Sequence, residues 1–343
     1  MSDLAKGIVS VVVPIFNLER YIGFCIESLL RQSLKSIEIL CINDGSTDRS
    51  SEIVKEYSNL DSRVILIDQE NKGAAAARNK GILAARGEYI MFVDGDDWVE
   101  ANAVEEVVAF TKKTNAEIVC FGASKCTEGQ EEERESEYIK YSENIAGDIR
   151  KIRLFELNVV PWGKLYKRSF LIENDLMFPE GLFFEDNAFF WNCMSCVKRI
   201  AVMEGGFYHY RIRKNSLMRS RGMKVENRGF HYLYGLDEIL KKWRSNGFIL
   251  NNKSLFQWIF EDYVRLGYEC IDDKKIDLYR SEVEKRINAW EGIVRCRWGT
   301  LPSDLVNRRK ISFFKYRKFR SIYKRQLVLE SFGMMLKEKF FAR

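Results

Sequence analysis

Short runs of apolar, often β-branched residues alternate with helix-like segments along the N-terminal third of this chain. The runs are residues 9–14, 37–43, 64–67, 89–93 and 118–122, and the helix-like segments between them are residues 19–31, 50–57, 74–85 and 103–113. Near-continuous apolar strands that alternate with helices are typical of a parallel sheet covered by helices on both faces. The pattern therefore predicts an α/β fold.

Polar residues follow each of the first four runs. Asn17, Asp44, Asn71 and Asp94 come after the first, second, third and fourth run respectively. In open α/β sheets, ligands bind beyond the carboxyl ends of the strands. We therefore expect these four side chains to line one crevice.

The fourth run ends in three carboxylates, Asp94, Asp96 and Asp97. Clustered negative charge at the tip of a buried strand is costly unless a cation neutralises it, and carboxylate oxygens are ligands for divalent metal ions. The cluster therefore favours a metal-assisted enzyme. Asp97 has a second interpretation, because it opens the turn before Trp98 and can cap the next element.

Seven segments, in order, resemble the family 2 glycosyltransferases of bacteria, which have the GT-A fold. The segments are VSVVVPIFN, INDGSTD, ENKGAAAARNKG, GEYIMFVDGDD, PWGKLYKR, FPEGLFFEDNAFF and FYHYRIRKNSLM. The resemblance implies a Rossmann-like nucleotide-binding sheet, mixed or parallel and flanked by helices. It implies a catalytic domain at residues 1–225, and we expect residues 226–343 to form a mainly α-helical C-terminal region.

The same resemblance implies a UDP-sugar donor and a divalent metal ion, Mn²⁺ or Mg²⁺. Asp96 is then the main metal ligand, and Asp94 contacts the ribose or the metal. Asp44 is expected to accept the imide N–H of uracil, and the alternative for this residue is an Asx-turn. The residues expected to bind the nucleotide sugar are Pro14, Phe16, Asn17, Asp44, Asn71, Arg78, Asp94, Gly95, Lys164, Arg211, Arg213 and Ser216.

Glu185 and Asp186 form the candidate catalytic pair. Phenylalanines flank them on both sides in the sequence, and apolar surroundings raise the pKa of a carboxyl group and make it a better general base. The family resemblance favours Asp186 as the base, with Glu185 supporting it or contacting the donor. The alternative is an ordinary helix N-terminus, where acidic residues are also favourable.

The segment from Phe207 to Ser216 resembles the mobile loop that closes over the diphosphate in this family. Arg211, Arg213 and Ser216 carry the hydrogen-bond donors that a diphosphate requires. His209 is a further candidate metal ligand. Upstream, Trp162 and Lys164 are expected on the sugar or acceptor side.

Composition agrees with a globular enzyme. The chain has 343 residues, of which 46% are hydrophobic and 30% charged. No apolar run reaches the length of about 18 residues that a transmembrane helix needs, and a signal-peptide pattern is absent, so we expect a cytoplasmic protein. Cys193 and Cys196 have zinc-ligand spacing, but no second pair partners them, and buried reduced thiols are the favoured interpretation of the eight cysteines.

The basic charge is concentrated at the C-terminal end. Residues 301–343 contain 12 Lys and Arg against 3 Asp and Glu, a net charge of +9, whereas the remaining residues have a net charge of −3. The basic residues alternate with large apolar ones. Basic amphipathic segments bind anionic membrane surfaces, which predicts a peripheral protein on the inner face of the cell membrane. The alternative is a helix packed on its own domain.

Together these features predict an inverting, metal-dependent glycosyltransferase. It is expected to move a hexose or N-acetylhexosamine from a UDP-sugar to a glycolipid or surface-glycan acceptor, as in lipopolysaccharide or capsule synthesis, with no nucleic-acid partner. A noncatalytic nucleotide-sugar-binding protein and a sugar nucleotidylyltransferase are the alternatives. The segment Pro14–Asn17 contains no glycine, which argues against the glycine-rich loops of nucleotidylyltransferases and nicotinamide enzymes.

Overall fold

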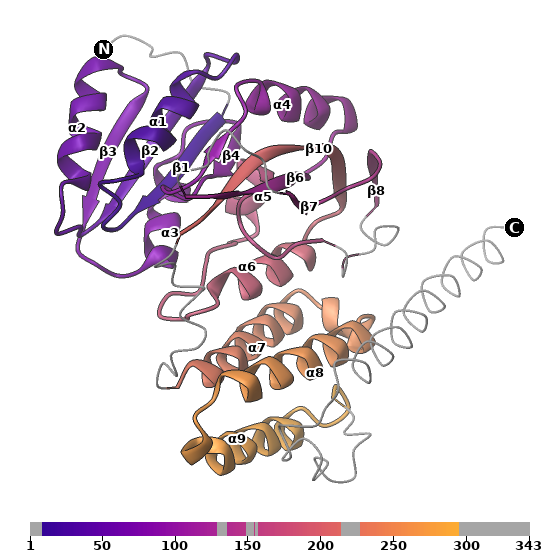
Figure 1. Cartoon of the computed structure of the whole chain (residues 1–343). Helices are drawn as coiled ribbons and strands as arrows, with labels where there is room; N and C mark the ends of the chain where they lie inside the picture. Colours follow the sequence, from indigo (N-terminus) through magenta and orange to yellow (C-terminus); the bar gives the residue numbers. More distant parts are fainter. Residues whose placement is uncertain (1–8, 129–135, 149–153, 155–156, 214–226, 295–343) are drawn as a thin grey trace, which may run out of the picture. The chain divides into compact units, whose positions relative to one another are not determined.

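The computed structural model describes residues 9–128, 136–148, 154, 157–213 and 227–294 (Figure 1). The chain divides into two compact units, Met1–Met223 and Lys224–Arg343. The first unit contains a mixed sheet with helices on both faces, and the described part of the second is helical. The α/β fold expected from the alternating pattern is therefore confirmed, including the C-terminal helices.

One mixed sheet forms the centre of the first unit. Its strands follow the order β3-β2-β1-β4-β9-β6-β10-β5, with β7 paired to β6 and β8 paired to β10. The strands are β1 (Val9–Ile15), β2 (Ile37–Asp44), β3 (Val64–Gln69), β4 (Tyr89–Phe92), β5 (Trp98–Val99), β6 (Ile118–Thr127), β7 (Ser136–Ile139), β8 (Ile145–Asp148), β9 (Lys164–Lys167) and β10 (Arg199–Ile212). Strands β1 to β4 are parallel, so their carboxyl ends meet at one edge.

Strand β9 separates the two halves of the sheet. It runs antiparallel to both of its neighbours, with Leu165 opposite Met91 of β4 and Val119 of β6. The five runs of the sequence pattern, β1 to β4 and β6, therefore all point in the same direction, as expected, and β9 is the antiparallel strand inserted between the fourth and the fifth. The PWGKLYKR segment comes some 40 residues after the fifth run, so its pairing is a long-range contact that local periodicity does not report.

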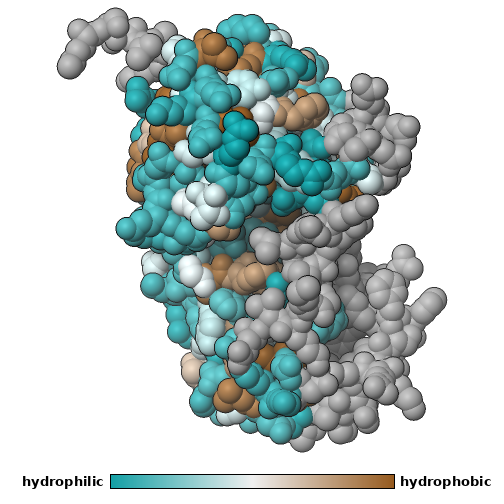
Figure 2. Space-filling model, turned by 60° about the vertical axis from the view of Figure 1, so that its left-hand side comes forward, coloured by the Kyte–Doolittle hydropathy of each residue, from teal (hydrophilic) through white to brown (hydrophobic). Residues whose placement is uncertain are grey.

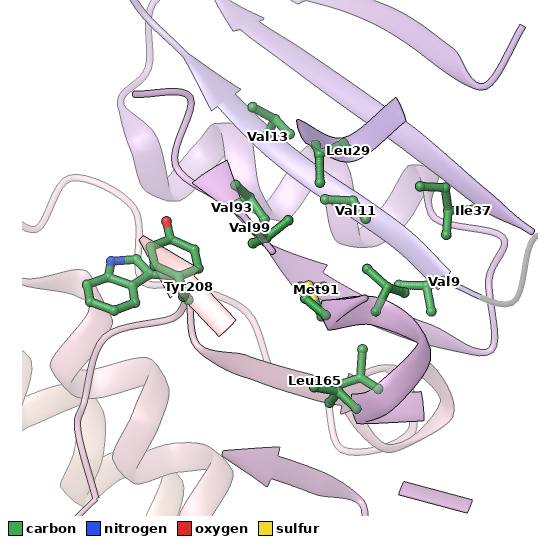
Figure 3. Packing of buried hydrophobic residues seen from close by; sticks show 14 of the residues in the cluster. Val9, Val11, Val13, Leu29, Ile37, Met91, Val93, Val99, Leu165 and Tyr208 are labelled. Atoms are coloured by element: carbon green, nitrogen blue, oxygen red, sulfur yellow. The ribbon is translucent and has the colours of Figure 1, made fainter. Parts of the chain in front are cut away.

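Helices cover both faces of this sheet. They are α1 (Ile22–Leu30), α2 (Ser50–Leu60), α3 (Ala74–Ala84), α4 (Ala103–Thr114), α5 (Arg168–Glu173) and α6 (Glu185–Met194). Because side chains alternate along a strand, Val11 and Val13 of β1 belong to the core shared with α1 and α4, whereas Val12 points to α3. Figure 3 shows part of the core on the α1 and α4 side of the sheet.

The second core lies around Phe92 of β4. Its ring makes edge-on contacts with Tyr166 of β9, with Phe178 and with Phe189 of α6. Phe178 and Phe189 are themselves stacked, with ring centroids 3.8 Å apart. This aromatic cluster seats α6 on the sheet and thereby fixes where its first residues lie.

The described part of the second unit consists of α7 (Arg228–Ser245), α8 (Lys253–Cys270) and α9 (Ile276–Ala289), with the short helices η4 (Phe248–Leu250) and η5 (Asp273–Lys275). Trp243, Phe256 and Trp290 pack edge-on in its interior. Among the described residues, no helix has the length and apolar character needed to span a membrane. The basic segment 301–343 lies outside the described residues.

The coloured surface in Figure 2 is mainly hydrophilic, with hydrophobic residues in small groups. The most exposed large apolar side chains among the described residues are Leu60, Leu250 and Leu83, at 84%, 72% and 66%. They belong to three different helices, α2, η4 and α3. Apolar residues scattered singly are normal on a protein surface and do not by themselves indicate a binding site.

Candidate functional site

The turn after β4 presents the acidic cluster. The amide of Val93 still donates to Val12 O of β1, at 3.1 Å, and the chain then turns, with Asp97 N donating to Asp94 O at 2.9 Å. Gly95 packs so closely that a Cβ there would lie 3.2 Å from Pro14 O. Pro14 and Gly95, both expected to bind the nucleotide sugar, thus hold the acidic turn against the end of β1.

The three carboxylates of the turn have different surroundings. Asp97 is 1% exposed, and its carboxylate accepts hydrogen bonds from the Tyr208 hydroxyl at 2.6 Å and from Arg211 N at 2.8 Å. Burial raises the pKa of Asp97 well above its usual range, and the nearby Asp96 and Asp94 add to this. Asp97 therefore anchors the turn in the protein interior.

Asp96 faces two arginines, Arg211 of β10 and Arg213, which directly follows that strand. Its carboxylate forms an ion pair with Arg213, with 2.7 Å between Oδ2 and Nε. Its main-chain carbonyl accepts from Arg211 Nε at 2.7 Å. Burial raises the pKa of Asp96, against the lowering effect of Arg213. Asp96 is thus a carboxylate that already has a cation beside it.

Arg211 is buried, and its guanidinium carbon lies 4.7 Å from the ring centroid of Trp98 and 5.4 Å from those of Tyr21 and Phe24. A guanidinium packed over aromatic faces is stabilised by cation–π attraction. Arg213 is more exposed and lies 5.1 Å from the Tyr21 ring. Ser216, the third residue expected to bind the diphosphate, lies outside the described residues.

Arg78 of α3 joins the acidic turn to α6. Its guanidinium donates to Asp94 Oδ1 at 2.9 Å and to Glu185 Oε1 at 2.8 Å, and it is almost fully buried. Burial lowers the pKa of Arg78, but the Asp94 and Glu185 carboxylates outweigh it and raise the pKa overall. One cation therefore brings the two acidic clusters of the sequence together, although 107 residues separate Arg78 from Glu185.

Asp186 is at the first turn of α6, beside Glu185. One of its carboxylate oxygens accepts from the amide of the next residue, Asn187, at 2.9 Å. Burial raises the pKa of Asp186 to about 7, with a further contribution from Glu185 and against the lowering effect of Arg78. A carboxyl group that titrates near neutral pH is suited to general-base work.

The loops after the first three strands are tied to one another. Asp44 is buried, and its carboxylate accepts from Gln69 Nε2, Lys72 N and Gly73 N at 2.7–2.8 Å. The Asx-turn given as the alternative role of Asp44 is not among these bonds, and the amide of Ser46 donates instead to Asn43 Oδ1 at 3.1 Å. A carboxylate has about four acceptor positions, so Asp44 retains one for a ligand.

Asn17, Phe16 and Asn71 complete this group of loops. Asn17 Oδ1 accepts from Thr47 N at 2.8 Å, which joins the loop after β1 to the loop after β2. The main chain of Asn71 lies against Gly45, where a Cβ would be only 2.9 Å from Asn71 N. Phe16 is 46% exposed and is therefore accessible as a stacking surface. The four loops at this edge of the sheet thus contact one another.

His209, Trp162 and Lys164 lie in the interior. The ring of His209 stacks on Trp98, with Nε2 3.0 Å from Glu100 Oε1 and Nδ1 3.7 Å from Cys126 Sγ. Trp162 stacks on Tyr208 at 4.5 Å. Lys164 is 1% exposed, its Nζ donates to Val160 O, and burial lowers its pKa.

Five of the seven described cysteines are buried, including Cys193. Within the ranges that the structure describes, no group of three or more His, Cys, Asp and Glu side chains is arranged to hold a metal ion by itself.

Two solved structures share this architecture. TarS of S. aureus in complex with UDP-GlcNAc superposes with a TM-score of 0.58 at 22% identity, covering 83% of this chain and 90% of that chain. The mannosyltransferase PcManGT of Pyrobaculum calidifontis, in complex with GDP-Man and Mn²⁺, superposes with a TM-score of 0.52 at 14% identity, covering 98% and 89%. The fold of the chain is thus GT-A-like.

Sequence comparison identifies the family. Residues 10–174 match Glycosyl transferase family 2. Glycosyltransferase GlyG of Streptococcus pneumoniae serotype 4 is 34% identical over 235 residues, which are 64% of this chain and 74% of GlyG. The chain belongs to glycosyl transferase family 2. It spans 31%, 65% and 62% of three other curated relatives, each 35% identical to it.

Proposed function

We propose that this protein is an inverting, metal-dependent glycosyltransferase that moves a hexose or N-acetylhexosamine from a UDP-sugar to a glycolipid or surface-glycan acceptor. The observation that carries the proposal is the Arg78 bridge between Asp94 and Glu185. It links the carboxylates suited to a metal–diphosphate group to the carboxyl pair that contains the candidate base. Donor activation and proton removal thus share one connected set of side chains.

The carboxylates of the acidic turn fit a hard divalent cation. Asp94 and Asp96 supply oxygen ligands, and the Arg213 ion pair indicates that Asp96 favours a positive partner. Mg²⁺ is commonly bound by one or two carboxylates together with substrate phosphates, which agrees with the small number of ligands here. When bound, such an ion neutralises the charge that develops on the departing diphosphate. His209 is left out of this ligand set, because both its ring nitrogens lie near other partners.

The remaining residues are assigned by their exposure and by the hydrogen bonds that they already make. Phe16 is exposed and is suited to stack on a uracil base, and the remaining acceptor position of Asp44, which is 3% exposed, is assigned to the imide N–H of that base. Asn17, Asn71 and Gly95 shape the surrounding loops. Arg213 is suited to the diphosphate. Arg211 and Lys164 are buried and already donate to main-chain carbonyls, so they support the site from the interior. The GT-A-like fold and the family agree with a nucleotide-sugar donor.

Asp186 has the role of general base. In an inverting reaction it takes the proton of the acceptor hydroxyl as that oxygen attacks the anomeric carbon, and the bond to the diphosphate breaks on the opposite face. Its raised pKa matches this task at neutral pH. Glu185, held by Arg78, keeps the start of α6 beside the acidic turn.

The decisive experiment measures UDP release from a panel of UDP-sugars, with and without EDTA, by the purified full chain and by Asp96→Ala. We expect release that depends on Mn²⁺ or Mg²⁺ in the parent, and loss of metal-dependent UDP binding with an intact fold in Asp96→Ala. Full activity in EDTA would remove the metal from the mechanism. Tight donor binding without hydrolysis or transfer would indicate a noncatalytic binder, and pyrophosphate-dependent release of a sugar phosphate would indicate a nucleotidylyltransferase.

A further inference from the structure

The hydroxyl of Tyr208 makes two hydrogen bonds to the acidic turn. It donates to Asp97 Oδ2 at 2.6 Å and accepts from Asp94 N at 3.1 Å. Tyr208 belongs to β10, more than 100 residues further along the chain. A single group thus holds both ends of the Asp94–Asp97 turn.

The position of this hydroxyl is fixed by its surroundings. Tyr208 is fully buried, and its ring stacks on Trp162 at an interplanar angle of 8°. Its main chain pairs with Val99 of β5 and with Ala123 of β6. Since backbone and ring are both held, the hydroxyl is a rigid reference point for the turn.

The two bonds account for the different orientations of the three carboxylates. Asp97 is drawn into the interior, whereas the side chains of Asp94 and Asp96 keep 26% and 17% of their surface exposed. A buried tyrosine hydroxyl needs only one partner to be satisfied. The hydroxyl of Tyr208 has two partners, Asp97 Oδ2 and Asp94 N, on the same four-residue turn. This indicates that the two hydrogen bonds stabilise the conformation of that turn.

We propose that Tyr208 is a positioning residue that holds Asp94 and Asp96 in the arrangement that receives a divalent cation and the diphosphate of the donor. The proposal rests on the proposed function of that site. Tyr208 itself touches neither cation nor donor and acts only through the turn.

The test compares Tyr208→Phe with Tyr166→Phe as a matched control. The Tyr166 hydroxyl is also buried and donates to a single main-chain carbonyl, Pro161 O at 3.2 Å. Both variants lose one buried hydroxyl from the same sheet. Two measurements are made on the full chain: Mn²⁺-dependent UDP affinity by calorimetry, and hydrogen exchange of the amides of residues 94–98 without ligand.

We expect Tyr208→Phe to weaken UDP affinity about 10-fold or more and to speed exchange in the acidic turn, since a buried donor and a buried acceptor lose their partner. Tyr166→Phe should leave affinity within about twofold, as expected for a change away from the site. Unchanged exchange and affinity in folded Tyr208→Phe, or equal losses in both variants, would overturn the proposal. Should Tyr208→Phe not fold, Asp97→Asn weakens the same contact and carries the same expectation.

A parent protein that binds no UDP would contradict the proposed function instead. In that case the exchange measurement still tests the positioning role of Tyr208, because it needs no ligand.

Discussion

Asp186 shows how one residue can combine two requirements. It lies in the first turn of α6, where an acidic residue is favourable, and its carboxylate accepts from the Asn187 amide. Its pKa is nevertheless raised to about 7, because burial and Glu185 disfavour its charge more than Arg78 favours it. The two interpretations of this acidic pair, cap and base, are therefore compatible.

The first prediction concerns Asp186→Asn. Transfer should fall by roughly 100-fold or more, the usual scale for loss of a general base, while UDP and metal affinity stay nearly unchanged. Parent activity should decline as the pH falls below about 7, where the carboxyl is protonated. Initial rates over pH and calorimetry with UDP measure these effects. Near-normal turnover would leave Asp186 as a helix cap.

The second consequence of the raised pKa concerns stability, which should decrease as the pH rises, whereas activity should increase. The folded pKa of Asp186 lies above its usual value of 3.8, so its neutral form is favoured by folding, and the stability it contributes is lost as the pH rises through about 7. Asp186→Asn should therefore melt higher than the parent at pH 8. Glu185→Gln serves as the comparison, and it should cost less activity than Asp186→Asn if it only supports the base.

Sequence reasoning at this scale located residues whose position follows from a strand end. Asp44 is the last residue of β2, and Asp94 and Asp96 lie in the turn that follows β4. The partners of these residues were missed. Tyr208 and the Arg78 bridge act across more than 100 residues, and a buried tyrosine in a strand looks the same in sequence whether it binds a carboxylate or only packs.

At the scale of elements, the contact between α3 and β1 fixes the place of Arg78. Gly81 faces Val12 so closely that an added Cβ would lie 2.2 Å from Val12 Cγ1. Asn79 also holds α3, because its side chain exchanges hydrogen bonds with the main chain of Phe178 at 2.8 and 2.9 Å. The helix therefore has little freedom to shift.

The second prediction is that Gly81→Ala destabilises the protein by about 1–3 kcal/mol, the usual cost of overpacking. Val12→Ala in the same chain should recover part of this loss, since it removes the clashing methyl groups. Gly235→Ala in α7 is the control, because nothing lies within 4 Å of its added Cβ, and it should be neutral or stabilising. Denaturant midpoints are measured for the parent, Gly81→Ala, Val12→Ala, their double variant and Gly235→Ala, and additive effects of the Gly81 and Val12 changes would contradict the contact.

Helices and strands of the first unit were predicted well because their apolar periodicity is local. Helix α3, expected at residues 74–85, is Ala74–Ala84, and α4, expected at residues 103–113, is Ala103–Thr114. The short strands β5, β7 and β8 went unnoticed, since two to four residues are too few for a periodic pattern. The resemblance to a mobile loop from Phe207 onward was wrong for residues 207–212, which are the end of strand β10 and pair with β6.

At the scale of the whole molecule, charge is the property that the sequence describes most directly. The net charge of +9 in residues 301–343 contrasts with −3 in the remainder. An anionic surface attracts such a segment through each Lys or Arg near it, with about 1 kcal/mol per residue.

The third prediction therefore concerns removal of the chain from about Asn307 onward. The shortened protein should remain folded but lose sedimentation with acidic vesicles, and the full chain should detach from them as salt rises. Neutral phosphatidylcholine vesicles are the control and should bind neither protein. Salt-insensitive binding, or aggregation of the shortened protein, would favour a helix that packs on its own domain.

The antiparallel strand β9 has a consequence for how the chain folds during synthesis. Strands β1 to β4 and their helices are complete in sequence once residue 92 has been synthesised. The other side of β4 pairs with β9, however, and β9 is the strand that joins β4 to β6. Until residues 164–167 arrive, β4 is an unprotected edge, the kind of surface at which nascent chains associate wrongly. Slow translation between residues 92 and 164 would prolong the exposure of the β4 edge. Chaperone binding to the nascent chain should be greatest during this interval.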